Sequence, residues 1–194
     1  MKTSVIVFIA AIIILIAIGY KMTGNIEKTG EAVKDSPTKV LLRTNMGDIV
    51  IELYDNMPIT SENFENLVKQ GVYDGVIFHR VIPNFMIQGG DPTGTGMGDP
   101  SIPAIEDEFV KGSSNLKYTV AMANRGPNTG SSQFFINLVD NTYLDWDKPP
   151  LTSKHPVFGK VVEGMDVIDK IGQVQTGAND KPVQDVVIEK AEII

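Results

Sequence analysis

The residues best suited to chemistry lie in the segment 78–91, whose sequence is FHRVIPNFMIQGGD. It sets a single arginine, Arg80, between two apolar runs and ends in a pair of glycines. Side chains alternate between the two faces of an extended chain, so Phe78 and Arg80 are expected to share one face. After the proline bend, Met86 and Gln88 are expected to share another. The pattern predicts a guanidinium beside apolar and amide groups, although a core strand with one surface arginine would also fit.

Three further blocks follow in the chain: MANRGPNT at 122–129, SQFFI at 132–136 and VFGKV at 157–161. Together with 78–91 they resemble, in the same order, the signatures of the cyclophilin family of peptidyl-prolyl cis/trans isomerases. The resemblance runs from about Thr38 to the end of the chain. It implies an enzyme that accelerates rotation of X-Pro peptide bonds and needs no metal and no organic cofactor.

The implied reaction needs no nucleophile. Rotating an X-Pro bond breaks amide resonance, which imposes a barrier of about 18–20 kcal/mol. In the twisted transition state the nitrogen lone pair is no longer shared with the carbonyl, so a donor at that nitrogen stabilises the twisted form more than the planar form. A guanidinium suits this task because it stays protonated and presents its N–H groups in a rigid plane. By resemblance, Arg80 takes this role.

The resemblance also implies a surface site for proline-containing segments of unfolded or flexible proteins. An apolar slot for the proline ring is expected, with a histidine as its aromatic edge, and Gln88 is expected to position Arg80 and the substrate carbonyl. Main-chain groups near Asn124 would hold the extended peptide. A neighbouring subsite, in which Arg125 could favour acidic side chains or partly gate access, would take the residue before proline. The slot residues are Phe85, Met86, Phe135, Leu144 and His155; the peptide-holding residues are Ala123, Asn124 and Gln133; the subsite residues are Gly94, Thr95 and Arg125.

Each of these residues also has a purely structural interpretation. Single buried aromatic and leucine side chains are more often core than pocket, Gln88 could satisfy strand backbone, and His155 could be a loop residue. The main rival function is a tethered peptide-binding or holdase-like module that captures proline segments with little turnover. Tyr143, counted here with the substrate-binding residues, stands where many members have tryptophan, which puts tight binding of cyclosporin in doubt. The loop 146–154 that follows is longer than in many members.

Composition excludes several other classes of function. The chain has 194 residues, 42% of them hydrophobic, which suits one domain plus an extension. A formal net charge of −7 without a basic stripe argues against a nucleic-acid partner. The absence of cysteine excludes disulfides, thiol catalysis and cysteine-ligated zinc. The two histidines suggest no metal site, and we expect a monomer.

The N-terminus carries a membrane-directed segment. Residues 5–18 contain no charge and no proline, and a helix over residues 3–20 would be about 27 Å long, close to the roughly 30 Å of a bilayer core. We expect residues 1–21 to be an uncleaved anchor in the cell membrane, with the domain facing outside the cytoplasm. A cleaved secretory signal ending near Ala17 and Gly19 is the alternative. Residues 22–37 are predicted to be a polar linker, and residues 38–194 the isomerase domain.

The pattern of the domain is mainly β. Alternating apolar residues predict a hairpin around the turn 45–48, and short strands are expected at 76–82, 85–89, 118–123, 134–138, 157–161 and 186–193. Helices are expected from Pro58 to about Lys69 and from Met165 to Ile171, the second stopped by Gly172. The resemblance implies a closed eight-stranded antiparallel barrel capped by the two helices, with substrate bound on its outer surface. The hydrophobic helix precedes it.

Overall fold

The computed structural model describes residues 37–149 and 154–194. The expected membrane segment, the linker up to residue 36 and part of the 146–154 loop therefore lie outside the described residues. Within those residues, every helix is too short or too polar to traverse a bilayer.

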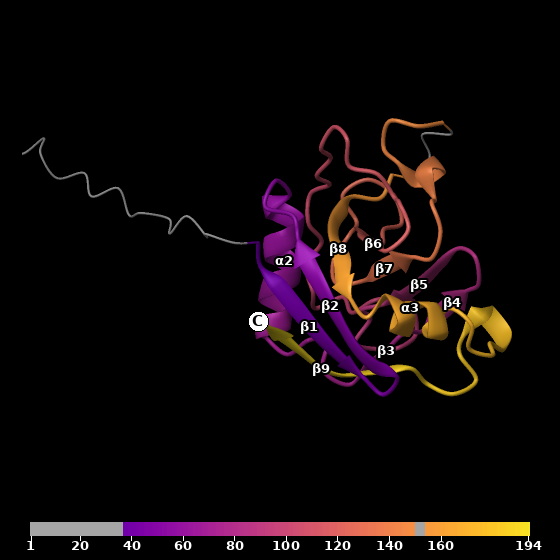
Figure 1. Ribbon diagram of the computed structural model, residues 1–194. Helices are drawn as coiled ribbons and strands as arrows, with labels where there is room; N and C mark the ends of the chain where they lie inside the picture. Colours follow the sequence, from indigo (N-terminus) through magenta and orange to yellow (C-terminus); the bar gives the residue numbers. More distant parts are fainter. Residues whose placement is uncertain (1–36, 150–153) are drawn as a thin grey trace, which may run out of the picture. The chain divides into compact units, whose positions relative to one another are not determined.

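Nine strands of the described chain form one antiparallel sheet, which curls around the core (Figure 1) in the order β3-β9-β1-β2-β8-β6-β7-β5-β4. The strands are β1 (Lys39–Thr44), β2 (Gly47–Leu53), β3 (Val76–Ile77), β4 (Arg80–Ile82), β5 (Met86–Gly89), β6 (Thr119–Met122), β7 (Phe134–Asn137), β8 (Val157–Glu163) and β9 (Val187–Ile193). The helices are α2 (Pro58–Lys69) and α3 (Met165–Ile171), with short 3-10 turns η1 (Thr142–Leu144) and η2 (Ala178–Asp180). The mainly β fold with two helices is confirmed.

The closed eight-stranded barrel is corrected to this curled nine-stranded sheet. The strand expected at 76–82 is divided, because Phe78 and His79 lie outside regular pairing. On one side of the break β3 pairs with β9, and on the other β4 pairs with β5, so the two edges of the sheet are neighbours in the chain. Phe78 is fully buried and its ring lies 6.2 Å from that of Phe134, whereas Arg80 is partly exposed. The expectation that Phe78 and Arg80 share one face is therefore wrong.

The two faces of the sheet carry separate apolar clusters. Alternate residues of β4 to β8, among them Val81, Ile87, Ile136 and Phe158, join the main core inside the curl. Their neighbours in sequence point to the opposite face, where a smaller cluster forms around Phe135. Since the period of a strand is two, stretches of these strands such as 120–122 and 134–136 are apolar on both faces.

Helix α2 packs its apolar residues Phe64, Leu67 and Val68 into the main core. Its Phe64 ring lies 4.9 Å from Tyr73, 5.3 Å from Phe134 and 5.2 Å from Phe158, measured between ring centroids. The helix begins at Pro58 without a side-chain cap of its own, and the Glu108 carboxylate from a distant loop accepts a hydrogen bond from the Thr60 N–H at 3.1 Å. The helix dipole favours an acidic group at this end.

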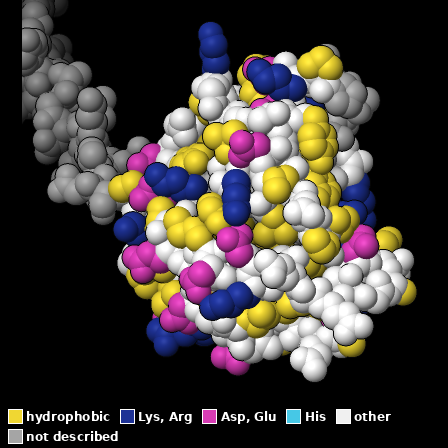
Figure 2. Space-filling view, turned by 45° about the vertical axis from the view of Figure 1, so that its right-hand side comes forward, with side chains coloured by type: hydrophobic (Ala, Val, Ile, Leu, Met, Phe, Trp, Pro, Cys, Tyr) yellow, Lys and Arg dark blue, Asp and Glu magenta, His cyan; other side chains and the backbone are white. Residues whose placement is uncertain are grey.

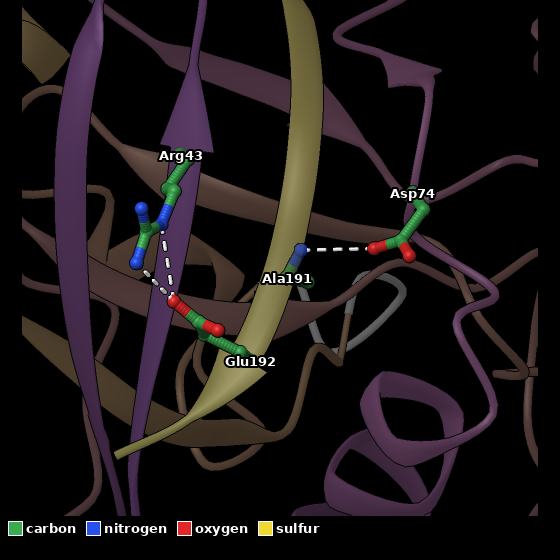
Figure 3. A network of polar contacts seen from close by, with 4 residues as sticks. All are labelled: Arg43, Asp74, Ala191 and Glu192. Atoms are coloured by element: carbon green, nitrogen blue, oxygen red, sulfur yellow. Dashed lines mark hydrogen bonds and ion pairs between the residues drawn. The ribbon is translucent and has the colours of Figure 1, made fainter.

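Strand β9 is fastened to its neighbours by polar contacts (Figure 3). Arg43 on β1 pairs with Glu192 through both Nε and Nη2, and the Asp74 carboxylate accepts a hydrogen bond from the Ala191 N–H at 3.0 Å. The Lys190 ammonium lies 2.6 Å from the same carboxylate and lowers the pKa of Asp74. These contacts tie β9 to β1 and to the segment before β3.

Candidate active site

One row of residues crosses the outer face of the sheet. Arg80 on β4 stands opposite Gln88 on β5, and Gln88 stands opposite Phe135 on β7. Phe135 in turn pairs with Ala121 on β6, which pairs with Val157 on β8. Strand register therefore places a cation, an amide and an aromatic ring side by side, although 55 residues separate Arg80 from Phe135 in the chain.

The apolar part of the row belongs to the outer cluster. Phe135, Met86 and Leu144 are only 4%, 2% and 6% exposed, while Phe85 is half-buried at the edge. Leu144 reaches the cluster from η1, and the Tyr143 ring stacks on Phe85 with centroids 6.3 Å apart. The sequence-predicted slot residues thus lie together, with Tyr143 half exposed at the rim.

The imidazole of His155 completes the aromatic edge. Its ring meets Phe135 edge-on, with centroids 5.3 Å apart and planes at 83°. Its Nδ1 lies 3.0 Å from the carbonyl oxygen of Met122, and its backbone N–H donates to the Leu144 carbonyl. Burial lowers the pKa of His155, against the smaller opposing effects of the Met122 carbonyl and of Asp107. The ring is therefore neutral at pH 7, with Nδ1 as the donor.

A chain of amide groups links the cation to a neighbouring loop. The Arg80 Nη1 lies 3.5 Å from Gln88 Oε1, and Gln88 Nε2 donates to Gln133 Oε1 at 3.0 Å. Gln133 Nε2 then donates to the carbonyl of Gly96 at 3.1 Å. On its other side, Arg80 Nε lies 3.5 Å from Asp180 Oδ2. The guanidinium is thus contacted by an amide oxygen and by a carboxylate.

Comparison with known proteins decides what this arrangement belongs to. Residues 39–193 match the family described as cyclophilin type peptidyl-prolyl cis-trans isomerase/CLD. The chain belongs to the cyclophilin family.

Its relatives span fungi and bacteria. Peptidyl-prolyl cis-trans isomerase-like 1 of Gibberella zeae is 48% identical over 164 residues, which covers 81% of this chain and 95% of that protein. A relative from Staphylococcus haemolyticus is 43% identical over 193 residues, covering 87% of this chain and 98% of that protein. Among solved structures, a Cryptosporidium parvum cyclophilin type isomerase, crystallised in the presence of the dipeptide Ala-Pro, aligns with a TM-score of 0.72 and 31% identity over 80% of this chain and 98% of that chain.

The chain is a cyclophilin-type peptidyl-prolyl cis-trans isomerase. Both charge signs are interspersed with apolar side chains on the face of this cyclophilin shown in Figure 2. In the described residues, no three His, Cys, Asp or Glu side chains come together as a metal-binding group.

The loop 91–98, which contains the predicted subsite residues Gly94 and Thr95, is organised around Asp91. This buried carboxylate accepts hydrogen bonds from the N–H groups of Thr93, Gly96 and Gly98 at 2.7–3.1 Å. Burial raises the pKa of Asp91, but the hydrogen bonds from the Thr93 hydroxyl and from these N–H groups outweigh it and the net pKa is lowered. The Thr95 hydroxyl lies 3.4 Å from the same carboxylate. Thr95 therefore helps to shape the loop that presents the Gly96 carbonyl.

The remaining predicted residues border this loop. Gly94 adopts a φ of +66°, a turn conformation that favours glycine. The exposed Arg125 donates from Nη1 to the Met97 carbonyl at 3.0 Å, which holds its head group at the loop rim. The Ala123 N–H donates to the Gln133 carbonyl, and Asn124 Nδ2 donates to the Lys154 carbonyl at 2.7 Å. Every predicted site residue is thus in this region, and their roles towards substrate stay predictions.

Sequence reasoning missed three groups that the fold brings to the site. Ala121 and Val157 extend the row, and they could be found only by knowing the strand pairing, because neither residue type signals a site. Asp180 reaches Arg80 from a segment 100 residues further along the chain. In the loop that follows Tyr143, Trp146 stacks on Phe109 with ring centroids 5.9 Å apart.

A buried histidine beneath the site gives a test of the local environment. His79 is 7% exposed, and neither of its ring nitrogens has a hydrogen-bond partner in the described chain. Burial lowers the pKa of His79; the positive charges of Arg80 and Lys181 lower it further, and Asp91 opposes them. His79 therefore binds a proton more readily in the unfolded chain than in the folded chain.

We expect the free energy of unfolding to decrease as the pH falls through about 6.5, by at most about 1.4 kcal/mol per pH unit for this group. Urea unfolding at a series of pH values between 8 and 5 measures it. The variant His79→Gln should reduce the pH dependence of the free energy of unfolding to the contribution of His155. The variant His155→Gln should leave the contribution of His79. An equal slope in the wild type and in the double variant would contradict the assignment.

Proposed function

We propose that Arg80 is the catalytic donor of this isomerase and that the outer cluster seats the proline ring. The observation that carries the proposal is the row on the outer face, in which the guanidinium stands two strands from Phe135 with only Gln88 between them. The proline ring would contact the cluster both in the planar peptide and in the twisted transition state. Only the twisted state offers an imide nitrogen with a free lone pair, so the donor lowers the barrier selectively.

The contacts of the guanidinium leave donors for this task. An arginine head group has five N–H bonds. The Nε side faces Asp180, and Nη1 faces Gln88 at 3.5 Å. Among the described residues, no partner takes the second hydrogen of Nη1 or the two hydrogens of Nη2, so these three are available to a substrate. Gln88 is itself fixed through Gln133 and the Gly96 carbonyl, which keeps its Oε1 towards Arg80.

The apolar surface keeps water from the rotating bond. Water would hydrogen-bond the planar amide and weaken the electrostatic effect of the guanidinium. Phe85, Met86, Phe135 and Leu144 supply this surface, and the neutral His155 ring adds an aromatic edge without adding a charge. The Ala-Pro dipeptide in whose presence the Cryptosporidium parvum relative was crystallised supports proline peptides as the substrate class.

We further propose that the enzyme works on unfolded or flexible proteins outside the cytoplasm, held at the cell membrane by residues 3–20 and a polar linker. The support is the uncharged, proline-free run at 5–18 and the polar composition of 22–37. The rival is secretion after cleavage near Ala17–Gly19.

Replacing Arg80 tests the catalytic assignment. We expect Arg80→Ala to lower kcat/KM by about a hundredfold, the usual effect of removing one donor to a transition state, in a chymotrypsin-coupled assay with a proline tetrapeptide. Circular dichroism and thermal unfolding should be close to those of the wild type, since Arg80 is partly exposed. Arg43→Ala, which removes an exposed arginine from β1, is the matched control and should retain activity. A variant Arg80→Ala with wild-type turnover would refute the mechanism.

The same assay separates catalysis from capture. A wild-type protein that binds the proline peptide but turns it over no faster than its Arg80→Ala variant would be the holdase-like module.

The position of Arg125 predicts a preference before proline. Its head group is held at the loop rim through the Met97 carbonyl, so acidic residues before proline should be turned over a few times faster than basic ones. Turnover of peptides with Glu-Pro and Lys-Pro measures the ratio. Arg125→Ala should bring the ratio close to one; equal rates in the wild type would remove the idea.

The location is tested on the mature protein. We expect an intact N-terminus and recovery in the membrane fraction, which N-terminal sequencing and fractionation measure. A new N-terminus near residue 20 together with recovery in the medium would establish the secreted alternative.

A further inference from the structure

The edge of the sheet beside Arg80 is covered by a short hairpin. Strand β4 is the last strand in the sheet order, and η2 packs against it beyond the C-terminal end of α3 (Figure 1). Residues 175–183 fold back on themselves, with the Val183 N–H donating to Gln175, Thr176 bridging to Pro182, and the Gly177 N–H donating to Lys181. The hairpin therefore presents its tip to the strand that carries the catalytic arginine.

The tip of this hairpin is held in an unusual backbone conformation. Asn179 and Asp180 have φ values of +59° and +58°. Non-glycine residues rarely adopt this left-handed region, and asparagine and aspartate are the types that tolerate it best. Two consecutive left-handed residues tighten the turn. The carboxylate of the second one, Asp180, lies 3.5 Å from Arg80 Nε. The strained turn and the ion pair occur at the same residue.

The two contacts of Arg80 fix its guanidinium from opposite directions. Asp180 takes the Nε side and Gln88 takes Nη1, so rotation about the last side-chain bonds would break one contact or the other. Gln88 alone, at 3.5 Å, is a weak restraint. The Asp180 carboxylate on the remaining side adds a Coulombic attraction at 3.5 Å, which, unlike a hydrogen bond, does not require close alignment.

We propose that Asp180 is a positioning residue for the isomerisation reaction: it orients the Arg80 guanidinium so that its Nη donors face the bond that rotates. This inference rests on the proposed role of Arg80. Asp180 itself touches no substrate; its effect is transmitted through Arg80 and concerns the transition state more than the bound peptide.

The variant Asp180→Asn tests it with the least disturbance. Asparagine keeps the shape and tolerates the positive φ, so the hairpin should persist while the charge is lost. Because the pair is half exposed, we expect kcat to fall roughly two- to fivefold with little change in KM. Asp185→Asn is the matched control: it removes a carboxylate of similar exposure near the same hairpin, one that pairs only with Lys181 among the salt bridges of the described chain. It should leave kcat unchanged.

Two further readouts separate positioning from a structural effect. In the Arg80→Ala background, Asp180→Asn should cause no additional loss, since an effect that passes through Arg80 disappears with it. The NMR signal of the Arg80 Nε–Hε group should shift in Asp180→Asn and not in Asp185→Asn.

The outcomes distinguish a failure of the role of Asp180 from a failure of the role of Arg80. Equal kcat for Asp180→Asn and Asp185→Asn, an undiminished effect in the Arg80→Ala background, or an unmoved Arg80 signal would each overturn the inference while leaving the role of Arg80 intact. If Arg80→Ala itself kept wild-type activity, the proposed mechanism would fail first, and the inference with it.

Discussion

The site depends on strand register. Across β4, β5, β7 and β6, the paired positions Arg80, Gln88, Phe135 and Ala121 fall in one line on the outer face. A slip of one residue in any of these pairings would turn that strand's contribution inwards, because successive side chains point to opposite faces. The inner core enforces the register, since Ile87, Phe134 and Ile136 must point into it. Packing of the core and placement of Arg80, the proposed catalytic group, are thus one constraint.

That constraint also explains why a water-poor surface can exist outside the core. The four residues of β6 and the four of β7 are all buried, and on the outer side Ala121 and Phe135 belong to the outer cluster. Phe135, Met86 and Leu144 are almost fully buried, whereas Phe85 and His155 at the rim of the cluster are partly exposed. This partly exposed aromatic rim favours a ligand with an apolar ring and a polar backbone. The proposed binding of an X-Pro segment follows from the same two-sided strands that stabilise the fold.

The sequence predicted the local elements well and the long-range geometry incompletely. Helices 58–69 and 165–171 were predicted because proline, glycine and apolar spacing mark their ends. The break at Phe78 and His79 could not be predicted, since it arises where one segment must pair with β9 and then with β5. Apolar alternation carries no information about which distant strand will be the partner.

The same difference holds for the site. The predicted residues lie in blocks with recognisable composition, and the fold gathers them. Asp180 and Val157 entered only through tertiary contacts, because an aspartate in a turn and a valine in a strand are ordinary there. The neutral state of His155 likewise depends on burial next to Phe135, which its position before a proline does not reveal.

The proposed mechanism requires a fixed guanidinium that faces the imide nitrogen of a proline ring seated on the outer cluster. A structure of the enzyme with a bound X-Pro peptide tests it most directly. We expect the proline ring to lie against Phe135 and Met86, with the Nη groups of Arg80 directed at the nitrogen of the X-Pro bond. A peptide bound elsewhere, or an Arg80 head group turned away from the bound ring, would contradict it.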